Sequence, residues 1–242
     1  MPFERNRSLD RRATRSRACE IKPALTLRDA VARPKPAQSA LERARRVRYA
    51  GAVMRTTSDT ALIVVDVQES FRHSTYWSEA DVPAFLAAVQ RLTDDAARAG
   101  VPVVQILHVQ PEGAFARESG YVRALDGYRI APDVTFHKTH HSAFAGTDLQ
   151  AWLTEHGVTR VVVCGIRTEQ CCETTSRHAS DLGYAVDYVT DATLTFPMTH
   201  PRTGRTYSPA EIKERTELVL EGRFATIARA ADAFSPAVAA AR

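Results

Sequence analysis

The sequence predicts an α/β protein of three layers, with helices on both faces of a mostly parallel six-stranded sheet. From residue 60 onward, short apolar runs alternate with amphipathic segments, which is typical of buried parallel strands joined by helices. The amphipathic segments also begin and end at residues that favour helix termini. The first of them, for example, starts after Asp81 with Pro83 in its first turn and stops at Gly100.

Six apolar runs are predicted to be strands. The first, residues 61–65 (ALIVV), is apolar throughout and is followed directly by Asp66. The others, in chain order, are residues 103–107, a short strand near 134–136, and residues 161–164, 185–189 and 224–227. Sheets of this kind bind ligands where the carboxyl ends of the strands pass into loops. Polar residues at those ends are therefore candidate site residues.

Four amphipathic segments are predicted to be helices. They begin after Asp81, after Thr147, after Thr168 and at Ser208-Pro209-Ala210-Glu211, which is a capping box with proline at the first helical position. The glycines that end the first three are Gly100, Gly157 and Gly183. Most of the irregular stretch 109–137 is predicted to be loop, because it holds proline, glycine and scattered aromatic residues.

The beginning of the chain differs in composition from the rest. Residues 1–55 contain fifteen Lys/Arg and five Asp/Glu, a net charge of +10, whereas residues 56–242 contain seventeen and twenty-three, a net charge of −6. The basic part has no sustained apolar run, so it cannot bury enough surface to offset its ordering entropy. We therefore predict a disordered basic extension over residues 1–54 and one folded domain over residues 55–242. Two alternative explanations of this segment are open. Translation of the native protein starts at Met54, so that residues 1–53 are not part of it, or the Arg-rich segment has a targeting role.

Cysteine usage and hydropathy predict a cytoplasmic protein without a membrane segment. No window approaches the roughly 18 apolar residues of a membrane span, and no apolar segment of a secretory signal follows the paired arginines Arg11 and Arg12. The four cysteines, at positions 19, 164, 171 and 172, fit neither a secreted disulfide framework nor a zinc-binding spacing.

Cys171 is the strongest chemical feature of the sequence. If Thr168 caps a helix, Cys171 occupies the third helical position, where free backbone N–H groups and the helix dipole lower the pKa of a thiol. Cys172 lies about 100° further around such a helix, on the stripe predicted to face the core. We predict that Cys171 is a nucleophile and that Cys164 and Cys172 are core residues.

Two charged residues lie at predicted strand ends on the same edge of the sheet. Asp66 closes an apolar run, and a carboxylate there is costly unless it is paired, hydrogen-bonded or functional. Lys138 follows the short strand and can supply the cation that stabilises a carboxylate or a thiolate. Either residue alone could have a purely structural role. We interpret both as site residues because they are predicted to lie at the same edge of the sheet as Cys171.

Three segments carry a resemblance to a known family. Residues 62–71 (LIVVDVQESF), residues 138–149 (KTHHSAF..T.L) and residues 163–175 (VCGIRTEQCCETT) resemble, in order and spacing, the signature blocks of isochorismatase-like cysteine hydrolases. The resemblance covers roughly residues 60–230 and implies a Rossmann-like fold with an Asp66–Lys138–Cys171 triad. It also implies a cis peptide bond between Ile166 and Arg167, and an oxyanion hole formed by the backbone N–H groups of Arg167 and Cys171.

The resemblance implies a hydrolase that cleaves a carbon–nitrogen bond. Cys171 favours the amidase branch, which includes nicotinamidases and N-carbamoylsarcosine and ureidoacrylate amidases, and which acts on small amide, ureido or lactam compounds through a thioester. An alternative is hydrolysis of a vinyl ether, which needs no cysteine. A function of a different class is nucleic-acid binding through residues 1–53, although residues 56–242 carry no such motif. The family resemblance also implies a homo-oligomer.

We expect no metal ion and no cofactor. The residues after Asp66 lack the Asp-x-His motif with which nicotinamidases bind a metal, and His108 is predicted to be a neutral, hydrogen-bonded residue rather than a ligand. His137, His140 and His141 are predicted to face solvent.

Five residues are further candidates for substrate binding: Phe71, Trp77, His108, Tyr121 and Arg167. The direction of the Arg167 side chain is open at this point. It can pair with Glu169 or a neighbouring subunit, or it can bind a substrate carboxylate.

Overall fold

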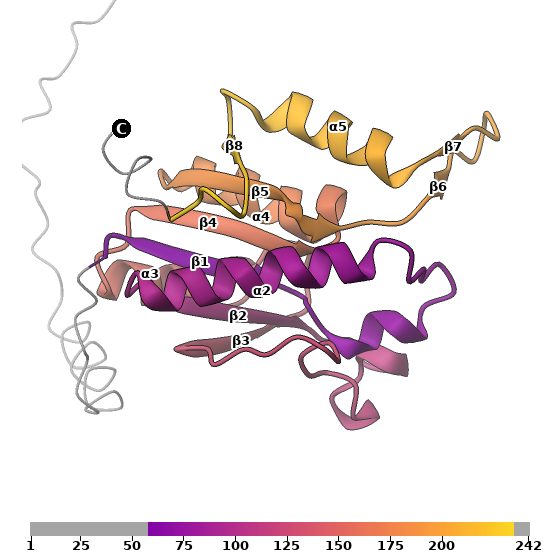
Figure 1. The fold of residues 1–242 in the computed structure, drawn as a ribbon. Helices are drawn as coiled ribbons and strands as arrows, with labels where there is room; N and C mark the ends of the chain where they lie inside the picture. The colour runs from indigo at the N-terminus through magenta and orange to yellow at the C-terminus, as the bar shows by residue number, and fades with distance from the viewer. Residues whose placement is uncertain (1–57, 235–242) are drawn as a thin grey trace, which may run out of the picture. The chain divides into compact units, whose positions relative to one another are not determined.

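A computed structural model of the chain describes residues 58–234, and the basic extension predicted over residues 1–54 lies outside this range, as does Cys19. The described part contains a six-stranded sheet with strand order β3-β2-β1-β4-β5-β8 (Figure 1). Every neighbouring pair in this sheet is parallel. The predicted fold class is therefore confirmed.

The first five strands extend beyond the predicted apolar runs, mostly at their carboxyl ends, whereas the last strand begins two residues later than predicted, because its pairing with β5 starts only at Thr226. Their bounds are β1 Thr60–Val65, β2 Val103–His108, β3 Val134–Lys138, β4 Arg160–Ile166, β5 Ala185–Leu194 and β8 Thr226–Ala228. His108 and Lys138 are strand residues because they pair with each other in the parallel ladder. β5 continues past the predicted end at residue 189 because Thr193 and Leu194 pair with β4 beyond a register shift.

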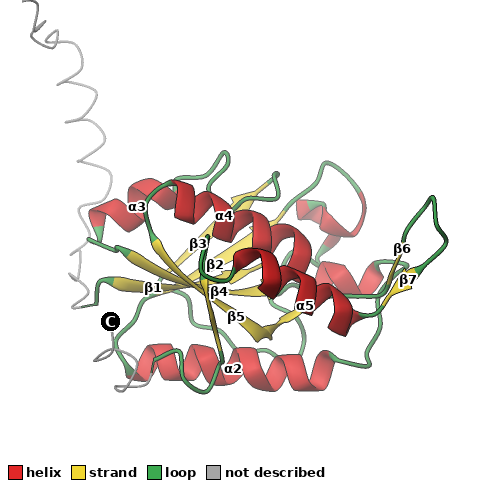
Figure 2. Cartoon of the chain, turned by 90° about the horizontal axis from the view of Figure 1, so that it is seen from above, coloured by secondary structure: helices red, strands yellow, loops and turns green. Residues whose placement is uncertain are grey.

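The helices form two layers, one on each face of the sheet (Figure 2). They are α2 (Val82–Arg98) on one face, and α3 (Leu149–Glu155), α4 (Glu173–Asp181) and α5 (Pro209–Leu220) on the other. Two apolar clusters fill the spaces between the layers, and the larger side chains of α2 belong to one cluster while those of α3 and α4 belong to the other. The predicted capping box opens α5: the Glu211 N–H donates to Ser208 Oγ, and the Glu211 carboxylate accepts from the Ser208 N–H.

The start of the fourth predicted helix differs from expectation. Residues Thr168–Cys172 form a π-helical turn, and α4 begins only at Glu173. Thr168 is not an N-cap: its hydroxyl donates to Thr193 Oγ1 at 2.8 Å. The Arg167 carbonyl instead accepts from two N–H groups of the turn. Cys171 therefore lies ahead of α4 rather than in its first turn.

A small antiparallel sheet between β5 and α5 was not predicted. It pairs β6 (Met198–Thr199) with β7 (Thr206–Tyr207) and extends from one end of the described domain (Figure 1). Strands of two residues carry no periodic signal, so hydrophobic periodicity could not predict them. Within the described residues, no helix combines the length and hydropathy needed to span a membrane.

Candidate active site at the carboxyl ends of four strands

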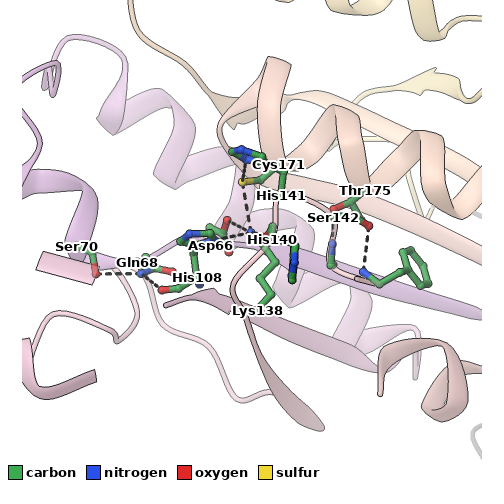
Figure 3. A network of polar contacts seen from close by, with 12 residues as sticks. Asp66, Gln68, Ser70, His108, Lys138, His140, His141, Ser142, Cys171 and Thr175 are labelled. Atoms are coloured by element: carbon green, nitrogen blue, oxygen red, sulfur yellow. Dashed lines mark hydrogen bonds and ion pairs between the residues drawn. The ribbon is translucent and has the colours of Figure 1, made fainter. Parts of the chain in front are cut away.

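Four adjacent strands bring the candidate residues to one edge of the sheet. Lys138 is the last residue of β3, His108 the last of β2, Asp66 follows β1, and Cys171 lies in the turn after β4. Figure 3 shows the side chains of these residues converging at this edge. The rule that ligand sites form at the carboxyl ends of parallel strands thus predicted the place of the cluster.

The structure brings Asp66, Lys138 and Cys171 into direct contact. Lys138 Nζ lies 2.7 Å from Asp66 Oδ2 and 3.3 Å from Cys171 Sγ. Asp66 is 0% exposed, Lys138 1% and Cys171 6%. A thiol, a carboxylate and an ammonium group therefore share one enclosed space in which water screens their charges little.

The Lys138 ammonium has more partners than protons. Besides Asp66 and Cys171 it contacts His108 Nδ1 and the His140 carbonyl oxygen, each at 3.1 Å. An ammonium group has three N–H donors, so four acceptors share three protons. Nζ donates hydrogen bonds to His108, His140 and Cys171, and the Asp66 carboxylate is held beside it as an ion pair.

Burial and the neighbouring charges act in opposite directions on the pKa values of Asp66 and Lys138. Burial raises the pKa of Asp66 although the nearby Lys138 ammonium opposes this effect. Burial lowers the pKa of Lys138, but Asp66 and Cys171 together outweigh it, and the net direction is upward. Lys138 thus stays a cation, and Asp66 is a stronger proton acceptor than an exposed carboxylate.

The pKa of the Cys171 thiol is raised, whereas the sequence analysis predicted that it is lowered. Burial, followed by the negative charge of Asp66, raises the pKa of Cys171 to about 12, and Lys138 opposes the shift only in part. The predicted lowering depended on a place in the first turn of an α-helix, which Cys171 does not have. At neutral pH the residue is a thiol, and it becomes a nucleophile only by losing its proton to a neighbouring base.

His108 is held in one tautomer. Burial and the Lys138 cation lower the pKa of His108 to about 4, so the ring is neutral at neutral pH. Because an ammonium group can only donate, His108 Nδ1 accepts from Lys138 Nζ and the ring proton resides on Nε2. Atoms of Asp66, His108 and Cys171 lie within 4.8 Å of one another, a spacing that could suit a metal ion. In this structure the Lys138 ammonium contacts the same three side chains and supplies the positive charge.

Gln68 is a structural support of the site that the sequence analysis missed. Its side chain is 0% exposed and binds the backbone of His108 twice: Oε1 accepts from the N–H at 2.7 Å, and Nε2 donates to the carbonyl at 3.0 Å. Gln68 thus ties the chain after β1 to the end of β2. The available signal was an amide two residues after Asp66 in a segment predicted to be buried.

His141 is a second residue whose contact was missed. His137, His140 and His141 are all exposed, as expected. His141 Nδ1, however, also lies 3.7 Å from Cys171 Sγ. No periodicity could have indicated this contact, because the segment after β3 is an irregular loop.

The Arg167 side chain pairs with Glu169, which is the first of the two possibilities that the sequence analysis left open. Its Nη2 lies 2.9 Å from Glu169 Oε1, and its guanidinium group lies 4.8 Å from the ring centre of Tyr76. The Thr195 hydroxyl donates to the other oxygen of Glu169 at 2.6 Å. Arg167 is thereby paired within its own chain. The peptide bond between Ile166 and Arg167 is cis, as the family resemblance implied.

The aromatic candidates contact other aromatic rings around the strand ends. Phe71 is buried and meets Phe115 edge-on, with ring centres 5.1 Å apart. Trp77 packs against Phe196 at 5.3 Å, and the exposed Tyr121 stacks on His73 at 3.7 Å. Their role in substrate binding stays a prediction.

The comparisons with known proteins agree with this architecture. The isochorismatase domain matches residues 60–208, more than half of the chain. YrdC of Bacillus subtilis (strain 168), an uncharacterized isochorismatase family protein, is 29% identical over 170 residues, covering 69% of this chain and 90% of that protein. A crystal structure from Burkholderia xenovorans LB400, provisionally assigned to the isochorismatases, is 35% identical, covers 73% of this chain and 86% of that one, and has a TM-score of 0.66.

Three further similar proteins have names that state an enzymatic activity. Nicotinamidase 3 of Arabidopsis thaliana is 42% identical over 79 residues, which cover 33% of this chain and 40% of that protein. Streptothricin hydrolase of Streptomyces noursei is 33% identical over 141 residues, 56% of this chain and 50% of that protein. N-carbamoylsarcosine amidase from Thermoplasma acidophilum shares the fold, with 22% identity, a TM-score of 0.58 and coverage of 73% of this chain and 99% of that one.

Proposed function

Because the chain belongs to the isochorismatase family of hydrolases, we propose that it hydrolyses the carbon–nitrogen bond of a small amide, ureido or lactam compound through a thioester on Cys171. The observation that carries this proposal is the position of the Lys138 ammonium, 2.7 Å from the Asp66 carboxylate and 3.3 Å from the Cys171 sulfur. A buried cation between an acid and a thiol lets a proton pass from sulfur to carboxylate without leaving an unpaired charge.

The first step is formation of the nucleophile. Asp66 takes the thiol proton of Cys171, and the Lys138 ammonium, which already donates to the sulfur, pairs with the new thiolate. The thiolate then attacks the carbonyl carbon of the substrate. In this proposal the backbone N–H groups of Arg167 and Cys171 bind the oxyanion that develops.

The second step releases the amine. Protonated Asp66 gives its proton to the leaving nitrogen, the carbon–nitrogen bond breaks, and the acyl group remains on sulfur as a thioester. A water molecule then hydrolyses the thioester and regenerates the thiol. One carboxylate thus serves as base and then as acid, for which a pKa raised by burial is suited.

The environment of Arg167 favours an uncharged substrate. A free guanidinium group beside the nucleophile would recruit a carboxylate, but this one is paired with Glu169 and lies against Tyr76. Two similar proteins are amidases by name, a nicotinamidase and an N-carbamoylsarcosine amidase, and a third is a streptothricin hydrolase. We propose neutral amides and ureido compounds as the substrate class.

The test combines a substrate panel with variants of adjacent cysteines. Ammonia release from small primary amides and ureido compounds, and ring opening of lactams by product mass, are measured for the wild type, Cys171→Ala and Cys172→Ala, with intact protein mass recorded during turnover. We expect Cys171→Ala to lose both turnover and the acyl adduct. Cys172, 0% exposed and in the core cluster, is the matched control that should retain both. Undiminished ammonia release by a folded Cys171→Ala protein would refute the mechanism.

A further inference from the structure

The Cys171 sulfur has an enclosed side and an open side. On the enclosed side lie the carboxylate of Asp66 and the ammonium of Lys138, whose side chains are both 0% exposed. On the other side the ring of the exposed residue His141 places Nδ1 3.7 Å from the sulfur. Figure 3 shows the sulfur between the imidazole of His141 and the pair formed by Lys138 and Asp66.

This asymmetry determines where a thioester would be attacked. If the proposed function holds, the acyl carbon bonded to Cys171 lies on the open side, since protein atoms fill the other. The hydrolytic water reaches this carbon from solvent and meets His141 on the way. Asp66, by contrast, is buried on the enclosed side and is bound to Lys138.

We infer that His141 is the general base that activates water for hydrolysis of the thioester, an inference that rests on the proposed function. The imidazole takes one proton from water as the oxygen attacks the acyl carbon. The tetrahedral intermediate then collapses, the carbon–sulfur bond breaks, and the imidazolium gives the proton to the departing sulfur. The products are a carboxylic acid and the free thiol, so atoms and protons balance.

The other polar groups near the sulfur are occupied. His108 is neutral and its lone pair at Nδ1 already accepts from Lys138, so it has no site for a further proton from water. Lys138 is a cation and has no lone pair. The ring of His140 is directed to the Thr139 hydroxyl, with which its Nδ1 forms a hydrogen bond of 3.2 Å. Among the described side chains that contact the sulfur, His141 alone is both exposed and able to act as a base.

The experiment uses the full chain and p-nitrophenyl acetate, an activated ester that reports acylation by colour and leaves an acetyl group on the thiol. Acylation of Cys171 should stay within about twofold of the wild-type rate in His141→Gln, because Asp66 is the base of that step. Glutamine keeps a polar side chain at position 141 but cannot accept the proton from water. Turnover should fall at least ~10-fold, and acetylated Cys171 should accumulate in intact and peptide mass spectra. Hydroxylamine, which attacks thioesters without a base, should release the acetyl group from the variant. His137→Gln, which changes another exposed histidine of the same segment, is the control and should behave as wild type.

Two results would overturn the inference: turnover by His141→Gln at the wild-type rate, or slower turnover without accumulation of the acetyl thioester. Slower turnover without accumulation would mean that the substitution slows acylation rather than hydrolysis of the thioester. Failure of the proposed function looks different, because p-nitrophenolate release would then persist in Cys171→Ala and no acetyl group would map to Cys171 in any variant. Thermal unfolding of each variant confirms that an exposed substitution has left the fold intact.

Discussion

Asp66 joins an unusual backbone conformation to a chemical role. Among the described residues it is the only non-glycine residue with a positive φ, at 51°. Aspartate and asparagine tolerate this left-handed region better than other side chains with a Cβ. Asp66→Asn therefore keeps the conformation after β1 and removes only the charge, which makes it the most informative variant of the site.

We expect Asp66→Asn to affect two reactions of Cys171 in opposite directions. Hydrolysis should fall by at least ~100-fold, because the base is lost. Alkylation of Cys171 by iodoacetamide at neutral pH should become at least ~5-fold faster, because the carboxylate that raises the pKa of the thiol is gone. Alkylation is followed by peptide mass spectrometry, which separates Cys171 from the buried Cys164 and Cys172.

Lys138→Met removes the positive charge next to Cys171, whereas Asp66→Asn removes the negative charge. Removing the cation that lowers the pKa of Cys171 should slow alkylation and also abolish hydrolysis. Equal alkylation rates in the wild type and both variants would show that these charges do not control the thiol.

His108 is expected to make the free energy of unfolding depend on pH. Its pKa is lowered in the folded protein from 6.5 to about 4, so between these values the unfolded chain binds the proton and the folded chain does not. Stability should therefore decrease as the pH falls through this window. Urea unfolding from pH 4 to 7 should show a steeper loss in the wild type than in His108→Asn. Identical slopes would mean that folding does not lower the pKa of His108.

At the residue scale, the sequence predicted the three side chains that the structure brings together and missed the residues that support them. Asp66, Lys138 and Cys171 were found because parallel strands place their carboxyl ends together and because apolar runs make polar strand ends conspicuous. Gln68 and His141 were missed because their contacts cross between strands or lie in an irregular loop. The pKa of Cys171 was predicted with the wrong sign because burial and the proximity of a carboxylate are tertiary properties.

At the scale of elements, the close packing of β4 on β1 sets the geometry of the site. Gly165 has φ +128°, and a Cβ atom on it would lie 1.9 Å from the Val65 carbonyl oxygen. Gly165 pairs with Val65 directly before Asp66 and precedes the turn that carries Cys171 by a few residues. Only glycine allows the two strands to approach at this point.

Gly165→Ala is therefore expected to destabilise the protein by about 3 kcal/mol or more and to abolish hydrolysis, because a backbone atom cannot move aside as a side chain can. Gly183→Ala is the matched control. Gly183 also has a positive φ, +92°, but nothing lies within 4 Å of its added Cβ, so only about 1 kcal/mol of backbone strain is expected. Urea unfolding gives both values. A Gly165→Ala protein as stable as the control variant would contradict the packing described here.

Prediction of the elements succeeded where local signals were strong. The six strands and the capping box of α5 were found from apolar runs and capping residues, whereas strand ends fixed by pairing, such as Thr193 with Gly165, were not. The π-helical turn Thr168–Cys172 also gave no signal, because two of its N–H groups bond to the Arg167 carbonyl, which precedes the turn. Backbone partners chosen in three dimensions leave little trace in sequence periodicity.

At the scale of the whole molecule, composition separates two kinds of polypeptide. Residues 1–55 carry a net charge of +10 and residues 56–242 one of −6. The fold class could be predicted because six strands and their connecting helices repeat the same pattern over the second part. The predicted boundary at residue 54 falls outside the described residues and stays a prediction.

This charge asymmetry leads to a prediction that separates hydrolysis from nucleic-acid binding. Binding of a labelled DNA duplex, measured by fluorescence anisotropy, should be detectable for the full chain at about 50 mM salt and strongly weakened at about 200 mM, since basic residues act by releasing counterions. A chain lacking residues 1–53 should lose this binding, because the remaining part is acidic. It should keep hydrolysis within about twofold, since Asp66, Lys138 and Cys171 all lie in the part that remains. DNA binding by the shortened chain would contradict the assignment of binding to residues 1–53, and a loss of hydrolysis on shortening would show that hydrolysis depends on them.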